Sequence, residues 1–221
     1  MIHTALQPPE NNILAREGKF KLNADGSLTG SIVEKRRGDH ALWERYALKE
    51  ANQQERLQRI ERLPNGSLQG FSLDNLEIQQ LDDRDQNLVL TYNFTVPNYL
   101  QVRGPLTLVR PRIFGDKSFA VDQKPRKYSL EMHSASRETD MFEIELPPGY
   151  KVDDIPNPVK VDMGFASYQS HSEVAGNTLR YSREYVVRDL HVSPERLADL
   201  RKFEGTIGSD EMASVVLVHE P

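Results

Sequence analysis

The chain has 221 residues, of which 38% are apolar and 28% charged, and its formal net charge is −5. This composition is typical of a folded globular protein of one or two domains, and it excludes a disordered chain and a free-standing basic nucleic-acid binder. The absence of cysteine excludes disulfide scaffolds, thiolate zinc sites and every mechanism with a cysteine nucleophile. Neither a signal peptide nor a membrane segment is predicted.

The beginning of the chain predicts a β-hairpin. Apolar residues alternate at 14–22 and 27–35, and Asp25-Gly26 between them supplies the positive φ that a tight turn needs. The same alternation predicts three further strands, at 76–78, 88–96 and 106–109.

Two helices are predicted between the hairpin and these strands. Asp39 can cap the first, and Asn52 with Glu55 three residues later has the spacing of a capping box for the second. Mixed charges on both segments predict an amphipathic pair that covers a sheet. The single tryptophan, Trp43, is expected to pack in the core rather than to form an exposed platform for carbohydrate.

The second half predicts short strands separated by turns, a spacing typical of a sandwich. Ser193-Pro194 is expected to begin a helix with one apolar face, and Gly205 is expected to end it. The predicted strands are 127–133, 141–146, 159–161, 165–174, 178–187 and 213–219.

Residues 111–125 have few periodic apolar positions, so a domain boundary is expected near 120–126. The predicted fold is mainly β, with two β-sandwich-like antiparallel domains and a few short helices. Residues 1–125 would form a β-rich domain with a helical insertion at about 39–63. Residues 126–221 would form a second β-sandwich with one helix at about 194–204.

No motif predicts catalysis, a metal or a cofactor. The six histidines lack a recognisable nucleophile context. His40 and Glu44 lie one helical turn apart but have no third ligand, and Asp83-x-Asp85-x-Asn87 lacks the glycine and the final glutamate of a calcium loop. We interpret the last motif as a turn.

Basic residues concentrate in 101–127, where seven basic and two acidic residues give a net charge of +5. Two interpretations are open: a surface for an anionic partner, or a solvated loop against an acidic neighbour. The candidate anionic-partner surface consists of Arg103, Arg110, Arg112, Lys124, Arg126 and Lys127.

Short motifs run through the second half: EIELPPGY at 143–150, Tyr168, LRYSR at 179–183, and Leu200, Phe203 and Ile207 on the predicted helix. Together they resemble the DUF3858-type β domain, which follows a transglutaminase-like domain in bacterial multidomain proteins that begin with a DUF3857-type domain. The first half, with its 22–30 turn motif, Gly38-x-x-Ala41 and Arg45, resembles the segment just after the transglutaminase-like core.

The resemblance implies a non-catalytic accessory or interaction module. The catalytic Cys, His and Asp of such proteins belong to the preceding domain, and a chain without cysteine cannot contain that site. The motif residues are expected to be structural, with Pro147-Pro148-Gly149 shaping a turn and Arg183 pairing across strands.

The resemblance also implies the partner, which is the preceding transglutaminase-like domain in a longer chain. Another protein or a glycan is the alternative partner. No nucleic acid is expected as a partner. Such parent proteins are often periplasmic or associated with the cell envelope. The competing interpretation is a stand-alone protein that binds a small ligand or an anionic polymer such as a carbohydrate through the basic segment.

Overall fold

The structure is a computed structural model that describes residues 7–62, 68–103, 106–122 and 124–219. Strands dominate it, which confirms the mainly β class. Its helices are η1 (Pro9–Asn11), α1 (Asp39–Lys49), α2 (Gln53–Arg62), η2 (Pro194–Arg196) and α3 (Leu197–Met212). Within the described ranges, no helix has the length and apolar character needed to cross a membrane.

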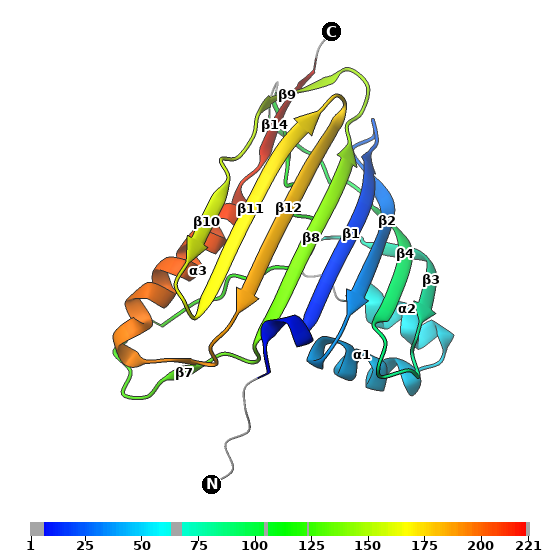
Figure 1. The fold of residues 1–221 in the computed structure, drawn as a ribbon. Coiled ribbons are helices and arrows are strands. Elements are labelled where there is room, and N and C mark those ends of the chain that lie inside the picture. The colour runs from blue at the N-terminus through cyan, green and yellow to red at the C-terminus, as the bar shows by residue number, and fades with distance from the viewer. Residues whose placement is uncertain (1–6, 63–67, 104–105, 123, 220–221) are drawn as a thin grey trace.

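Eight strands form one large twisted sheet in the order β10-β11-β12-β8-β1-β2-β4-β3 (Figure 1). All neighbouring strands in this sheet are antiparallel except β1 and β8, which pair in parallel. The paired residues of β1 and β8 are more than a hundred positions apart in the sequence. The strands are β1 (Ile13–Leu22), β2 (Leu28–Arg36), β3 (Ser72–Gln79), β4 (Leu88–Val96), β8 (Ser136–Glu145), β10 (Val159–Asp162), β11 (Ala166–Ala175) and β12 (Thr178–Val187).

A four-stranded sheet has the order β5-β6-β14-β9, and β7 (Leu130–Glu131) pairs with β13 (His191–Val192). The four strands are β5 (Gln101–Arg103), β6 (Leu106–Val109), β9 (Tyr150–Asp154) and β14 (Val215–His219). The pairs β1/β8 and β6/β14 both join the two sides of residue 125. The predicted division at residue 125 therefore does not separate two sheets.

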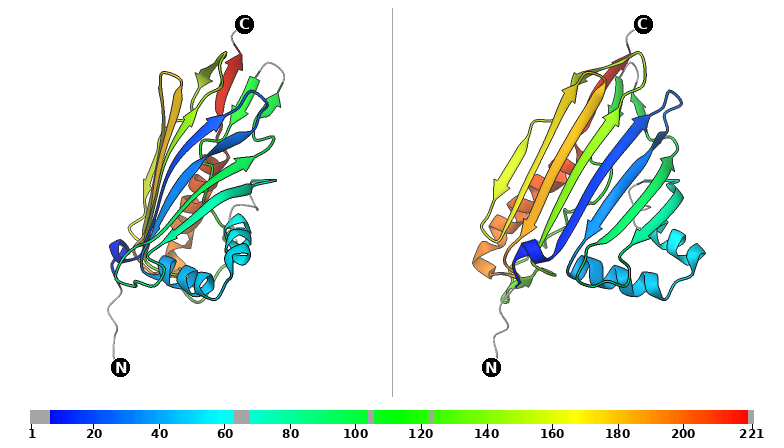
Figure 2. Two further views of the ribbon diagram at one scale, coloured as in Figure 1. Left: turned by 90° about the vertical axis from the view of Figure 1, so that its right-hand side faces the viewer. Right: turned by 45° about the vertical axis from the view of Figure 1, so that its right-hand side comes forward.

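The helices α1, α2 and α3 lie on one side of the large sheet, and its other face is uncovered (Figure 2). One core joins the inner face of this sheet to α1, α2 and the four-stranded sheet. Its centre is a cluster of phenylalanine rings, in which the ring centroids of Phe20 and Phe94 are 5.3 Å apart. A second core joins β11 and β12 to α3. Alternating inward and outward residues on the strands explain why only one face is apolar.

The two helix starts differ from each other. Asn52 and Glu55 form the predicted capping box, because each side chain accepts a hydrogen bond from the other's backbone N–H, at 3.0 and 2.8 Å. At α1 the prediction was wrong, since Gly38 is the cap residue and Asp39 makes no capping bond. The Asn12 side chain instead accepts a hydrogen bond from the backbone N–H of His40 at 3.2 Å.

The predicted end of the last helix was also wrong. α3 continues through Gly205 to Met212, because its buried face continues with Ile207 and Glu211. A glycine inside a helix costs only about 1 kcal/mol, which the burial of Ile207 offsets. The predicted strand at 127–133 shortens to β7, and β9 and β13 were not predicted.

Candidate functional site

A cluster of ionised side chains lies beneath the large sheet, on the inner face of β1, β2, β8 and β12. All its carboxylates are buried, and each lies next to at least one arginine or lysine. We call it the buried ionic cluster, and it consists of Arg16, Glu34, Lys117, Glu138, Asp140, Arg183 and Glu211.

Asp140 is the centre of this cluster. One carboxylate oxygen accepts a hydrogen bond from Arg16 Nη1 at 2.9 Å, and the other accepts one from Arg183 Nη2. The side chains of Asp140 and Arg183 are both 0% exposed. Because Arg183 lies directly opposite Asp140 in the β12/β8 register, the predicted pairing of Arg183 across strands is confirmed.

Glu138 is the next carboxylate along β8. Lys117 Nζ lies 2.6 Å from it and Arg16 Nη2 lies 3.9 Å from it. Burial alone would raise the pKa of Glu138, but the charges of Lys117 and Arg16 outweigh burial and lower it. Burial lowers the pKa of His40, which lies 3.7 Å from the same carboxylate.

A second chain of charges connects the cluster to α1. Glu34 accepts a hydrogen bond from Tyr92 Oη at 2.7 Å and pairs with Arg36. Arg36 Nη1 in turn lies 3.1 Å from Glu44 of α1, whose other oxygen lies 2.6 Å from Arg59 Nε of α2. A buried ion pair therefore attaches α1 to the sheet, and a half-exposed pair attaches α2 to α1.

Residues 115–122, which we call the strap, run along α3. Gly115 accepts a hydrogen bond from Arg183, and its φ of +77° is one that other residues rarely adopt. Glu211 accepts a hydrogen bond from the backbone N–H of Lys117 at 2.6 Å, and Glu204 accepts one from that of Phe119 at 2.9 Å. Burial raises the pKa of Glu204 to about 7.

These contacts join the large sheet to the strap and to α3. In the described part of the chain, no three His, Asp or Glu side chains are arranged to hold a metal ion.

Two turns that the sequence predicted are present in the structure. The backbone N–H of Asp85 donates a hydrogen bond to Asp83 Oδ1 at 3.0 Å, which confirms the predicted turn at 82–85. Pro147 accepts a hydrogen bond from the N–H of Tyr150 across the predicted Pro147-Pro148-Gly149 turn.

The residues of the candidate anionic-partner surface lie in separate places. Arg110 and Arg112 line one hollow, whereas Lys124, Arg126 and Lys127 are exposed beyond the other end of the strap. At one end of the strap, the backbone N–H of Lys117 donates a hydrogen bond to Glu211, and at the other end Arg201 donates one to the carbonyl of Asp122. Glu211 lies ten positions after Arg201 in α3, which corresponds to a rise of about 15 Å along the helix. The two groups of basic residues are therefore separated by about this length of helix. Arg103 ends β5, and only its backbone is described.

The hollow with Arg110 and Arg112, which we call the arginine hollow, has a volume of about 520 Å³. It lies where the end of β4 meets β6 and the residue before β14. Tyr99 Oη donates a hydrogen bond to the carbonyl of Arg110 at 2.6 Å, and burial raises the pKa of Tyr99. Arg112 pairs with Asp116, and its side chain is only 9% exposed.

The uncovered face of the large sheet has a hollow of about 580 Å³. His171 lies 3.9 Å from Glu173 there and is opposite Ser182 in the strand register. Among the described contacts no hydrogen bond joins Ser182 to His171, and the strands use their N–H groups in pairing. The described contacts therefore show no base that activates Ser182.

Helix α1 has two charged residues, Glu44 and Arg45, on its inward side and its aromatic residues on its outward side. Leu42, Trp43 and Tyr46 are 47%, 71% and 71% exposed, and we call them the aromatic face of α1. Glu44 and Arg45 are buried instead. The prediction that Trp43 packs in the core is therefore wrong.

The physical reason is that both charged residues have fixed partners inside. Glu44 pairs with Arg36 and Arg59, and Arg45 donates hydrogen bonds to the carbonyls of Asp83 and Gln86. These bonds set the rotation of the helix and leave Trp43 outside. Sequence reasoning assigned the apolar residues of α1 to the core and did not consider Glu44 and Arg45 as the inward face.

The comparison with known families matches residues 106–217 to DUF3858, a domain of unknown function with a solved structure. The match covers 112 of the 221 residues, slightly more than half of the chain. This chain belongs to the DUF3858 family. The DUF3858 region begins at β6, earlier than the predicted start at residue 126, and β6 pairs with β14 at the other end of the match.

No curated protein matches the chain. A crystal structure from Parabacteroides distasonis, described as a "putative protease", is similar to 45% of this chain at 17% identity and a TM-score of 0.40. The similarity covers 19% of the length of that protein.

Proposed function

We propose that this chain is a non-catalytic interaction module of a larger protein that contains a transglutaminase-like domain, and that it binds this domain through the aromatic face of α1. The observation that carries the proposal is the exposure of Trp43 and Tyr46 on a helix whose Glu44 and Arg45 are buried. Contiguous exposed apolar side chains on a folded domain are typical of interaction sites, and Trp and Tyr are the residues most often found at the centre of interfaces.

The rigidity of α1 supports this role. Glu44 and Arg45 hold the helix to β2, α2 and the turn at 82–85. The exposed side chains therefore project from a fixed backbone, and binding would cost little ordering of the helix itself. At the C-terminal end of α1, Glu50 is the cap residue and Lys49 lies 2.8 Å from Asp82, so charged groups flank the exposed aromatic side chains at this end of the helix.

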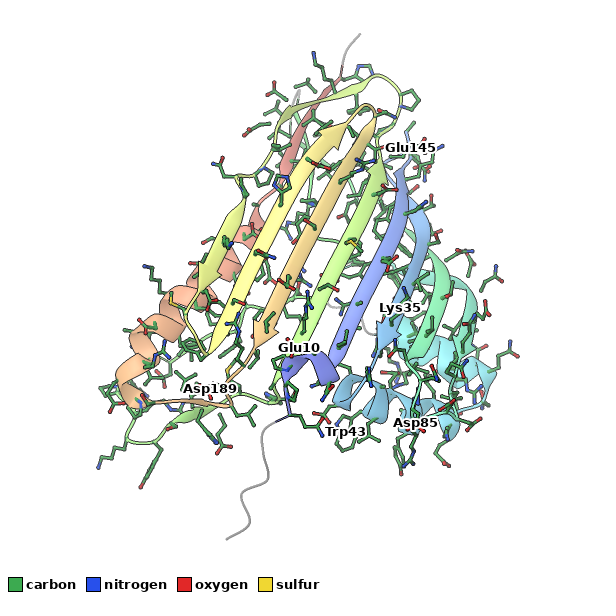
Figure 3. The ribbon with its side chains drawn as sticks, viewed as in Figure 1. Glu10, Lys35, Trp43, Asp85, Glu145 and Asp189 are labelled. Carbon is green, nitrogen blue, oxygen red and sulfur yellow. The ribbon has the colours of Figure 1, made fainter. Side chains whose placement is uncertain are left out.

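The position of the first described residues supports the choice of partner. Asn12 follows η1 and binds the start of α1 through the backbone N–H of His40. Glu10 and Trp43 lie at the same end of the large sheet (Figure 3). A domain joined ahead of residue 7 would lie beside the aromatic face, where a short connection gives a high effective concentration.

Two features support a non-catalytic role. The sequence has no cysteine, so it has no thiol nucleophile. The charged groups of the buried ionic cluster pair with one another inside the protein and are engaged in holding the sheet, the helices and the strap together.

The single tryptophan makes the proposal testable by ¹⁹F NMR. The chain labelled with 5-fluorotryptophan has one resonance, from position 43. We expect this resonance to shift or broaden when the separately expressed transglutaminase-like domain of the same protein is added. Tyr46→Ala should weaken binding at least tenfold, because Tyr46 lies one helical turn from Trp43.

Tyr128→Ala is the matched control, since Tyr128 is 82% exposed and lies outside α1. An unchanged ¹⁹F resonance on addition of the domain would overturn the proposal. Equal weakening by Tyr46→Ala and Tyr128→Ala would exclude the aromatic face as the binding site. A shift on addition of a soluble oligosaccharide, but not of the domain, would replace the proposal by glycan binding.

A further inference from the structure

The arginine hollow lies apart from α1, at the junction of the two larger sheets. One part of its wall is apolar, with Val96, Leu108 and Ile113, and the other part is polar, with Tyr99 and both arginines. Its volume of about 520 Å³ is within the range of sites for small molecules, which combine an apolar wall with a few polar groups.

Arg112 has more hydrogen-bond donors than its neighbours use. A guanidinium has five N–H donors, and the only partner of its side chain among the described residues is Asp116, at Nη1. The Nε of Arg112 is buried and has no hydrogen-bond partner. Its Nη2 also has no hydrogen-bond partner among the described residues, so the guanidinium has donors to spare for an acceptor in the hollow that Arg112 lines.

Arg110 adds a second positive charge to the same wall. Its backbone is fixed by the hydrogen bond from Tyr99 Oη to its carbonyl, and its guanidinium has no ion pair with any described residue. Asp116 is the acid that pairs with Arg112, and its side chain is 58% exposed. The residues that line the hollow therefore carry two positive charges and no negative charge, and Asp116 competes for Arg112 from outside the lining.

We propose that the arginine hollow binds the oxyanion of a small amphiphilic ligand, a carboxylate or phosphate group held by Arg110 and Arg112 with an apolar body against Val96, Leu108 and Ile113. Arginine suits this task because its planar fork of donors matches both kinds of oxyanion. The proposal does not depend on the aromatic face of α1, so either proposal can fail without the other.

The test uses the whole chain labelled with ¹⁵N-arginine and follows the Nε–Hε resonances by NMR. The titrants are inorganic phosphate, acetate and hexanoate, with sodium chloride at the same ionic strength as the control. We expect the Arg112 resonance to shift in a saturable way with an oxyanion and not with chloride. Hexanoate should bind several times more tightly than acetate, because its chain reaches the apolar wall. The relative affinities of phosphate and hexanoate distinguish the two kinds of ligand.

Two variants locate the site. Arg110→Ala should weaken binding about tenfold, since one charged donor group is lost. Asp116→Asn should strengthen binding, because it removes the carboxylate that competes for Arg112. Arg126→Ala, an exposed arginine elsewhere in the basic segment, should leave the affinity unchanged. The absence of saturable shifts would overturn the proposal, and so would an Arg126→Ala effect as large as that of Arg110→Ala. Tyr46→Ala should have no effect on this titration.

Discussion

Substitution of Asp140 by Asn is the most direct test of the buried ionic cluster. The side chain is 0% exposed and accepts charge-assisted hydrogen bonds from both Arg16 and Arg183. Asn has nearly the same shape, but it removes the negative charge and places an amide donor where an acceptor was. One hydrogen bond to a charged group is lost, at about 1.5–3 kcal/mol, and the other loses its charge assistance, so the total loss should be roughly the 3–5 kcal/mol expected when one partner of a buried ion pair is removed.

Urea unfolding measures this loss. The midpoint should fall by roughly 1–2 M with an unchanged slope, because a chain of this size unfolds with a slope near the upper end of about 1–3 kcal/mol per M. Glu184→Gln is the control, because Glu184 pairs with Arg137 on the uncovered face at 2.6 Å, where an ion pair contributes about 1 kcal/mol or less. A loss below about 1 kcal/mol for Asp140→Asn would refute the reasoning.

A second substitution in the Asp140→Asn background separates charge from packing. Adding Arg183→Met removes one of the two arginines that the first change left without their carboxylate. If the uncompensated buried charge causes the loss, the double variant should be at least as stable as Asp140→Asn alone. A further loss of several kcal/mol, on the order of a second buried-pair deletion, would show that shape and packing dominate at this site.

Three further predictions concern the strap and a helix start. Burial raises the pKa of Glu204 from 4.5 to about 7. The contribution of this group to stability is therefore present below pH 4.5 and is lost as the pH rises through 7. Glu204→Gln should remove this decline in the free energy of unfolding, measured with urea between pH 5 and 8, and an unchanged dependence of that free energy on pH would contradict the prediction. Gly115→Ala places a Cβ 2.7 Å from Arg16 Nη1 and from Arg183 Nη2. It should cost more stability than Gly176→Ala, because Gly176 also has a positive φ but a Cβ there meets no atom within 4 Å. Thermal unfolding compares the two variants, and equal losses would show that backbone strain alone accounts for the cost. Asn52→Ala removes the acceptor of the capping box and should cost about 1 kcal/mol, which chemical denaturation can detect; no loss would show that the box is energetically neutral.

The strands with alternating apolar residues could be predicted from the sequence almost to the residue. The strands at 88–96 and 178–187 have the predicted bounds, and the hairpin of β1 and β2 differs by one residue at three of its four ends and coincides at the fourth. The capping box at Asn52 was equally clear. Each of these signals lies within about ten residues of chain, where local periodicity and turn chemistry decide the backbone.

The candidate site shows the opposite case. The sequence drew attention to a basic segment, but its residues separate along the strap, and only Arg110 and Arg112 share a hollow. Arg16 and Asp140 form the centre of the buried ionic cluster although they are 124 residues apart. The alternation on β1 places Arg16 on the same face as Leu14 and Phe20, but nothing in the local sequence identifies its partner on β8.

The sequence by itself determined the mainly β class, the positions of the long strands, the DUF3858 motifs and the absence of a cysteine nucleophile. Only the tertiary structure decided the parallel pairing of β1 with β8, the continuity of the sheets across residue 125 and the outward position of Trp43. The physical reason is the range of the forces involved. Hydrophobic periodicity acts between neighbours along one strand or helix, whereas buried charges such as Glu44 and Arg45 fix the rotation of a helix through partners that the chain brings together only when it folds.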